Sequence, residues 1–105
     1  ERDDAASPLD REHRTGDEDA AISTLRRALK LDADYLEARI YLANLLYDKQ
    51  EYEAALYHFE KTTPADHWDE LGIWRLIELK KAAYRLKDDD PDLAPWEARL
   101  EELNG

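Results

Sequence analysis

Residues 36–59 read LEARIYLANLLYDKQEYEAALYHF, in which apolar side chains recur at spacings of three and four. That spacing places the apolar side chains on one face of an α-helix. The first apolar stripe consists of Leu36, Ile40, Ala43 and Tyr47, and the second consists of Tyr52, Ala55, Leu56 and Phe59. Because the link between them, residues 48–51, is short and polar, we expect two antiparallel helices that form a hairpin.

The chain on both sides of this hairpin also has a helical pattern. Residues 17–31 carry an apolar stripe, with acidic residues in the first turn and basic residues in the second half, as the helix dipole favours. After the hairpin, Thr63-Pro64 should end its second helix, because proline disfavours helical geometry in the preceding residue. Further apolar stripes predict a long helix over residues 66–86 and a short one over residues 96–103. The sequence therefore predicts an all-α fold.

The beginning of the chain differs from the rest. Residues 1–15 contain one Leu and no aromatic residue, so they cannot bury an apolar face. We expect a tail or a poorly formed helix there, with Ser7 and Pro8 suited to an N-cap and a first helical position. The absent initiator Met suggests a piece of a longer chain, and no signal peptide is visible. We expect a cytoplasmic location, or a periplasmic one if the parent chain is secreted.

Composition narrows the possible functions. The chain has 105 residues, with 15 Lys plus Arg and 26 Asp plus Glu, so its formal net charge is −11. That length fits one small domain. The negative charge disfavours sequence-independent binding to nucleic acid, because phosphate backbones are also negative. Cysteine is absent, which excludes disulfides and thiol chemistry. No apolar run approaches the about 20 residues of a membrane-spanning helix, so we expect no membrane insertion.

The helical pattern repeats with a period of 34 residues. At that shift the paired residues agree in character: Ala20 with Ala54, Ala21 with Ala55, Ile22 with Leu56 and Leu25 with Phe59. A helix hairpin of 34 residues is the unit of the tetratricopeptide repeat family, which the chain resembles over about residues 16–86. GDEDAAI at 16–22 and ALKLD at 28–32 look like the second helix of one repeat. LAN at 42–44 and EYEAAL at 51–56 look like a nearly complete next repeat.

The resemblance implies a short right-handed superhelical array of stacked antiparallel hairpins. Residues 16–34 would be the second helix of one repeat, residues 35–65 a full repeat, and residues 66–105 an irregular third hairpin that caps the array. Two positions depart from the family pattern. Ala33 replaces the usual proline that ends a repeat, and Gln50 replaces a loop glycine.

The resemblance also implies a partner-binding groove, lined mainly by the first helix of each hairpin. The implied groove positions are Glu37, Ile40, Asn44, Tyr47 and Asp48 in the full repeat, and Leu71, Trp74, Glu78 and Lys81 in the third hairpin. For Ile40 and Trp74, ordinary core packing is an equal alternative. Family members that grip a peptide carboxylate carry a lysine at the position of Ile40, so we do not expect that clamp. The implied repeat-packing positions are Ala21, Leu25, Ala28, Ala43, Tyr52, Ala55 and Phe59.

Three charged clusters have structural explanations. The basic residues within 80–87 could bind an acidic partner, but they more simply complement a helix C-terminus. The sequence DDDPD at 88–92 lacks the glycine and the terminal glutamate of a calcium loop, so an N-cap aspartate before Pro91 is favoured. The acidic residues and histidine within 66–70 splay around a helix axis, which favours capping over a metal site.

The sequence predicts a binding function rather than catalysis. No phosphate-binding glycine loop, nucleophile elbow or zinc-protease motif is present, and nothing suggests a cofactor or a metal. We expect an adaptor that binds a peptide or helix of a protein partner. Two alternatives stay open: self-assembly into a homo-oligomer through exposed end faces, and an accessory domain of a larger enzyme or secretion protein. The Ile22, Leu25 and Leu29 face would be partly bare and would suit a missing neighbour or a dimer contact.

Overall fold

The structure is a computed structural model that describes residues 8–105, with side-chain surroundings from residue 17 onward. Five α-helices follow one another: α1 (Pro8–Leu31), α2 (Leu36–Asp48), α3 (Tyr52–Phe59), α4 (Glu70–Tyr84) and α5 (Ala94–Asn104). Two single 3-10 turns, η2 (Pro64–Asp66) and η3 (Pro91–Leu93), precede α4 and α5. No strand occurs within residues 8–105, and the predicted all-α fold is confirmed.

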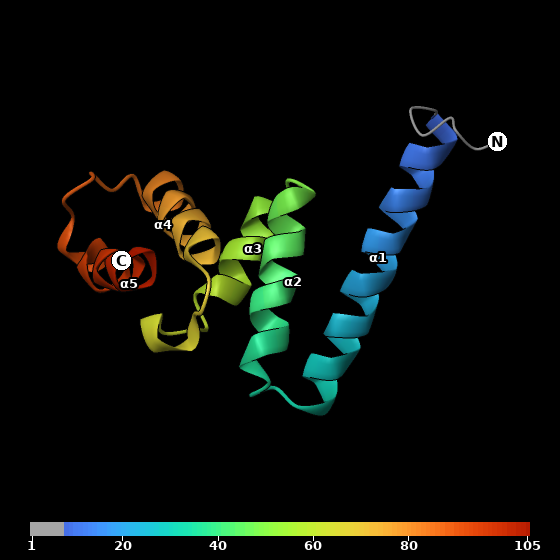
Figure 1. Ribbon diagram of the computed structural model, residues 1–105, viewed down its shortest axis with the longest axis horizontal. Helices are drawn as coiled ribbons and strands as arrows, with labels where there is room; N and C mark the ends of the chain where they lie inside the picture. Colours follow the sequence, from blue (N-terminus) through green and yellow to red (C-terminus); the bar gives the residue numbers. More distant parts are fainter. Residues whose placement is uncertain (1–7) are drawn as a thin grey trace.

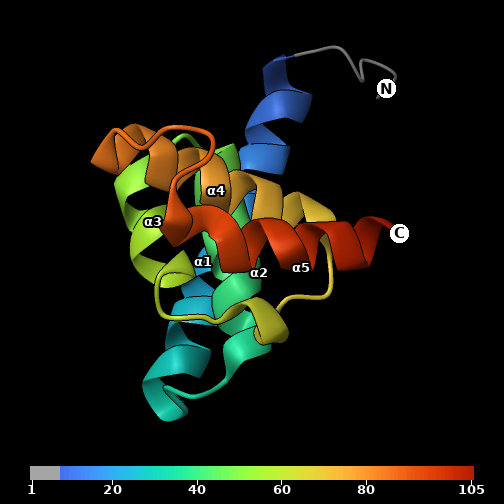
Figure 2. The ribbon, with the colours of Figure 1, turned by 90° about the vertical axis from the view of Figure 1, so that its left-hand side faces the viewer.

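The helices form an elongated row in chain order, about 52 × 32 × 28 Å in extent (Figure 1). α1 packs against α2, and α2 and α3 lie side by side as the hairpin predicted from residues 36–59. α4 packs against both α2 and α3, and α5 crosses in front of α4 when the molecule is turned (Figure 2). The first helices of the two hairpins, α2 and α4, are therefore neighbours.

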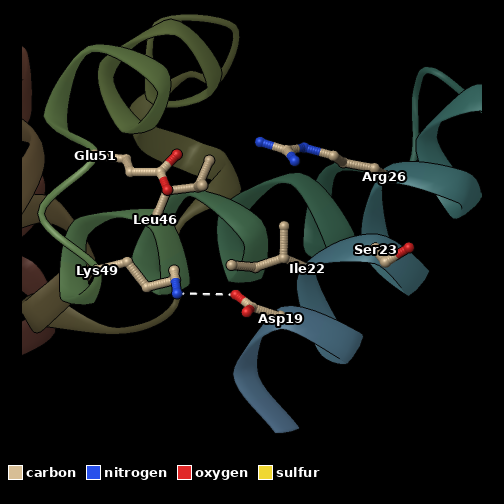
Figure 3. A pocket seen from close by; sticks show the side chains of 7 residues that line it. All are labelled: Asp19, Ile22, Ser23, Arg26, Leu46, Lys49 and Glu51. Carbon is tan, nitrogen blue, oxygen red and sulfur yellow. Dashed lines mark ion pairs between the residues drawn. The ribbon is translucent and has the colours of Figure 1, made fainter. Parts of the chain in front are cut away.

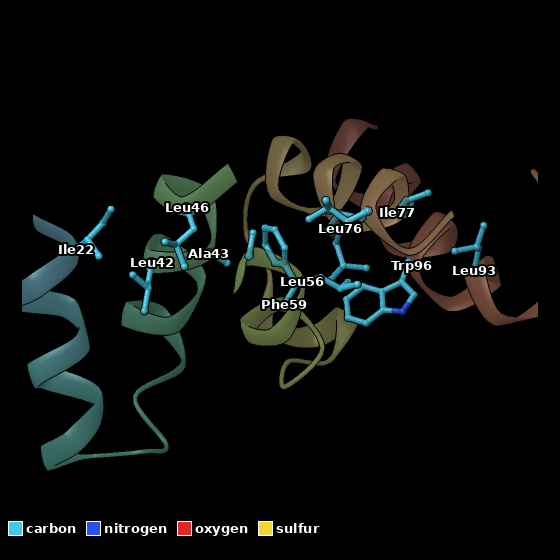
Figure 4. Packing of buried hydrophobic residues seen from close by; sticks show 13 residues of the cluster. Ile22, Leu42, Ala43, Leu46, Leu56, Phe59, Leu76, Ile77, Leu93 and Trp96 are labelled. Carbon is cyan, nitrogen blue, oxygen red and sulfur yellow. The ribbon is translucent and has the colours of Figure 1, made fainter. Parts of the chain in front are cut away.

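One continuous apolar core joins the helices. Its side chains run from Ile22 on α1, through the α2–α3 hairpin, to Trp96 on α5 (Figure 4). Ala43, Ala55 and Phe59 are each 0% exposed. The two small alanine side chains let the backbones of α2 and α3 approach closely. Burial of these residues, rather than helix propensity, supplies most of the stability of such short helices.

The expected packing positions are buried to different degrees. Ala21, Leu25 and Ala28 on α1 are half-buried, whereas the positions 34 residues later, Ala55, Phe59 and Thr62, are buried. α3 is covered by both α2 and α4, whereas α1 contacts mainly α2 among the described helices. Of the face expected to be partly bare, Ile22 is buried, and Leu25 and Leu29 are half-buried. Tyr52 packs at the surface, edge-on to Tyr47 with ring centroids 5.2 Å apart.

Two predicted boundaries are wrong. α1 begins at Pro8 rather than near residue 17, so the segment expected as a tail or poor helix is helical from Pro8 onward; the remainder of that segment lies outside the described residues. Proline is well suited to a first helical position. An internal glycine such as Gly16 costs a helix only about 1 kcal/mol, which does not end it.

The helix predicted over residues 66–86 is shorter, because two capping sites interrupt that segment. The carboxylate of Asp66 accepts a hydrogen bond from the Thr63 backbone N–H at 2.7 Å, which closes the turn of η2. Asp69 then caps α4 by accepting from the Leu71 N–H at 3.2 Å. At the other end, Arg85 adopts a left-handed φ of 56° and terminates α4. The capping role expected for the 66–70 cluster is confirmed for these two aspartates.

Gln50, which joins α2 to α3, has a left-handed φ of 66°. This conformation is unfavourable for a side chain that carries a Cβ atom, and glycine adopts it freely. We therefore expect Gln50→Gly to raise the free energy of unfolding by about 0.5–1 kcal/mol, measured by urea denaturation. Gln50→Ala keeps the Cβ atom and should give no such gain. An equal gain in both variants would contradict the explanation.

Candidate functional site

A cavity of about 250 Å³ lies between α2 and α4. α2 contributes the side chains of Ile40, Tyr41, Asn44 and Asp48. The start of α4 and the residues before it contribute His67, Trp68, Asp69, Leu71, Gly72 and Arg75. We call this hollow the α2–α4 groove. Four of the expected groove positions, Ile40, Asn44, Asp48 and Leu71, line it.

The other expected positions do not line the groove. Tyr47 lies beside it, with its ring centroid 4.6 Å from the guanidinium carbon of Arg75. Trp74 is 48% exposed on α4, and the ammonium of Lys81 lies 3.6 Å from the carboxylate of Glu78 on the same helix. Glu37 is exposed at the start of α2. Ile40 is only 3% exposed and forms part of the groove wall.

Arg75 fixes the two walls of the groove relative to each other. Its Nη1 donates to the backbone carbonyl and the side-chain Oδ1 of Asn44, at 3.3 and 3.0 Å. Its Nη2 donates to Asp48 Oδ1 at 2.7 Å, which is also an ion pair. The amide nitrogen of Asn44 in turn donates to the Ile40 carbonyl at 2.9 Å. A guanidinium held by several acceptors and stacked on an aromatic ring is a rigid spacer.

Aromatic side chains form the rim of the groove. Tyr41 from α2 and Trp68 from the segment before α4 have ring centroids 5.6 Å apart, with planes tilted by 60°. Tyr41 is 51% exposed, and Trp68 and Leu71 are each 47% exposed. Large apolar side chains that stay half-exposed around one cavity are typical of a surface that binds a partner.

His67 lies at the floor of the groove and is 1% exposed. The Thr62 hydroxyl donates its proton to the Phe59 carbonyl at 2.6 Å, so the His67 Nε2–H must be the donor to that hydroxyl at 2.8 Å. His67 Nδ1 then carries a lone pair. Burial lowers the pKa of His67 to about 4, and the positive charge of Arg99 acts in the same direction, against a smaller raising effect of Asp66. The ring is therefore neutral at physiological pH.

A second hollow, of about 270 Å³, lies where α1 meets the α2–α3 turn (Figure 3). Its floor is apolar, with Ile22 and Leu46, and the ammonium of Lys49 pairs with the carboxylate of Asp19 at 2.8 Å across one end. The other lining residues are Ser23, Arg26 and Glu51. This hollow contains no aromatic side chain among its lining residues, which makes it a poorer partner site than the α2–α4 groove.

The remaining charged clusters are held by local contacts. Lys81 pairs with Glu78 and Asp88, and Lys80 lies 3.8 Å from the carboxylate of Glu60. Asp90 accepts a hydrogen bond from the Asp92 N–H at 2.8 Å, so the predicted N-cap before Pro91 is confirmed. Within residues 17–105, no three side chains of the metal-binding types gather at one point.

Sequence reasoning missed Tyr41, Trp68 and Arg75. Arg75 and Tyr41 lie next to predicted groove positions, but the helical period alone did not separate the groove face from the adjacent face. Trp68 precedes the cap of α4, so a register that assumed a helix from residue 66 could not place it. The detectable signal was the sequence HWD at 67–69, in which an aromatic residue stands next to a capping aspartate.

Comparison with known proteins identifies one family. A family model described as tetratricopeptide repeat matches residues 13–71, more than half of the chain. No curated protein and no solved structure matches the chain. None of the described helices combines the length and the apolar character needed to cross a membrane.

Proposed function

Because the chain belongs to the tetratricopeptide repeat family, whose members generally mediate protein–protein interaction, we propose that it is an adaptor that binds a protein partner in the α2–α4 groove. The family is typically a non-catalytic scaffold. The bound element would be a peptide or one helix of the partner. Its side chains would enter the groove while α2 and α4 stay in place.

One observation carries this proposal: three half-exposed apolar side chains surround a single cavity between the first helices of two hairpins. Tyr41, Trp68 and Leu71 each leave about half of their surface in water. Covering that surface is favourable, at about 25 cal/mol per Å² of apolar area removed from water. Aromatic residues around a central cavity are also the residues that usually dominate binding energy at interfaces.

The size of the cavity favours a side chain over a free metabolite. Sites for small molecules usually have volumes of roughly 300–1,000 Å³ and bury most of the ligand surface. The α2–α4 groove has about 250 Å³, open to solvent, and therefore suits one or two anchoring side chains of a larger partner. The contacts of Arg75 with Asn44 and Asp48 support a pre-formed site, which lowers the entropic cost of binding.

The proposal is tested by selecting binding peptides from a random display library with the unmodified chain. Affinities of the selected peptides are then measured for Trp68→Ala and Leu71→Ala. We expect each substitution to weaken binding by about tenfold or more, because truncation of a central anchor typically costs over 1 kcal/mol. Both side chains are half-exposed, so the helical content of the variants should stay unchanged.

The matched control is Tyr57→Ala. Tyr57 is 58% exposed on α3 and does not line the groove, so its loss should leave peptide affinity unchanged. Peptides that bind the groove variants as tightly as the unmodified chain, or that lose affinity only for Tyr57→Ala, would contradict the groove proposal.

A further inference from the structure

We infer that the α2–α4 groove recognises a cationic side chain, Arg or Lys, of its protein partner. This inference rests on the proposed function and specifies the chemistry of the anchor. It follows from which polar groups around the cavity already have partners, from the aromatic rim and from the charge of the surrounding surface. An apolar or an acidic anchor is the competing outcome of the test below.

The hydrogen-bond donors of the groove are already used. The Asn44 amide nitrogen donates to the Ile40 carbonyl, and both terminal nitrogens of Arg75 donate to acceptors on α2. Arg75 is the one cation among the residues that line the cavity, and Asp48 balances its charge. An acidic anchor would therefore meet no uncompensated positive charge among the lining residues.

The acceptors, in contrast, have capacity left. Asp69 uses Oδ1 to cap α4 and Asp48 uses Oδ1 for Arg75, so each carboxylate keeps a second oxygen without a hydrogen-bond partner among the described residues. At the floor, His67 uses Nε2–H for Thr62, which leaves a lone pair on Nδ1. An ideal Cβ at Gly72 would lie 3.6 Å from this Nδ1, which places the lone pair against α4. Open acceptors require a donor, and guanidinium and ammonium groups are donors only.

The aromatic rim favours the same chemistry. A cation over the face of Trp or Tyr is attracted by the ring quadrupole, and Trp is the best of the aromatic residues for this contact. Tyr41 and Trp68 offer tilted, half-exposed rings at the mouth of the cavity. The chain already makes such a contact beside the groove, where the guanidinium of Arg75 lies 4.6 Å from the Tyr47 ring centroid.

The wider electrostatic field acts in the same direction. The amino end of α4 contributes about half a positive charge, but Asp69 and Glu70 at that end carry two full negative charges. The whole chain has a formal net charge of −11. Such a field accelerates association with a positively charged partner at low salt and repels a negatively charged one.

Three acetylated and amidated pentapeptides test the inference: Ala-Leu-Arg-Leu-Ala, its citrulline counterpart and its Glu counterpart. Citrulline matches Arg in shape and lacks the charge. Binding is followed by NMR through the indole N–H signals of ¹⁵N-labelled protein, with the Trp68 signal assigned from Trp68→Phe. We expect the Arg peptide to shift the Trp68 signal and to bind about tenfold more tightly than the citrulline peptide, with an affinity that falls as salt rises.

The matched variant is Asp69→Asn. Asn is as good an N-cap as Asp, so α4 should stay intact while one negative charge is lost. We expect the variant to weaken the Arg peptide severalfold and to leave the citrulline peptide unchanged. Equal affinity for the Arg and citrulline peptides, tighter binding of the Glu peptide, or no Trp68 shift with the Arg peptide would overturn the inference. If library-selected or uncharged peptides still bind through Trp68, the proposed function stands without it; if no peptide does, both fail.

Discussion

Phe59→Ala should lower the free energy of unfolding by about 3–5 kcal/mol, the usual cost of removing a buried phenylalanine ring. The ring is 0% exposed and lies in the one core that joins the two hairpins. Its centroid is 6.1 Å from that of His67, so the cavity left behind would open beside the groove floor. Urea denaturation followed by far-UV circular dichroism measures the loss.

Two controls make this result specific to the hairpin stack. Tyr57→Ala removes an exposed aromatic side chain from the same helix and should change stability by less than about 1 kcal/mol. Leu25→Ala changes the position 34 residues earlier, which is half-buried, and should cost less than Phe59→Ala. A Phe59→Ala loss no larger than that of Tyr57→Ala would contradict the packing described here.

Protonation of His67 is expected to destabilise the fold in mild acid by about 2–3 kcal/mol. The pKa of this histidine is lowered from 6.5 to about 4 in the folded chain, because its ring is buried. The folded state therefore favours the neutral ring. The resulting stabilisation is complete above the unfolded pKa and is lost as pH falls from about 6.5 towards 4.

The measurement compares the unmodified chain with His67→Gln across that pH range. The Gln amide can still donate to the Thr62 hydroxyl but does not titrate. Carboxylates and His58, whose pKa burial also lowers to about 4, titrate in both proteins and cancel in the comparison. We expect a smaller loss of stability in acid for the variant. Parallel pH profiles would contradict a buried neutral His67.

The sequence predicted the hairpin well because local rules agree there. The apolar stripe of residues 36–47, the polar link and the stripe of residues 52–59 all indicate two short helices, and α2 and α3 have those positions. α4 was placed less well, because Asp66 and Asp69 each cap a separate element and no periodicity distinguishes one cap from two. The early start of α1 could not be read from a segment with so few apolar residues.

The groove was predictable only in part. Ile40, Asn44 and Asp48 recur at a spacing of four on α2, so helical geometry alone places them on one face. The contribution of Trp68 and Arg75 depends on how α4 packs against α2, which the sequence pattern of one helix does not specify. The pairing of Tyr41 with Trp68 is likewise a long-range contact, between residues on different elements. The local pattern predicted the α2 wall of the groove, and the packing of the hairpins supplied the other wall.

The most direct test of the central claim uses the three tryptophan indole N–H signals. Trp68 lines the α2–α4 groove, Trp74 is half-exposed on α4 outside it, and Trp96 is buried in the core. Saturation with a library-selected peptide should move the Trp68 signal most, the Trp74 signal less and the Trp96 signal hardly at all. A peptide that binds while the Trp68 signal stays in place would show that the partner site lies elsewhere on the chain.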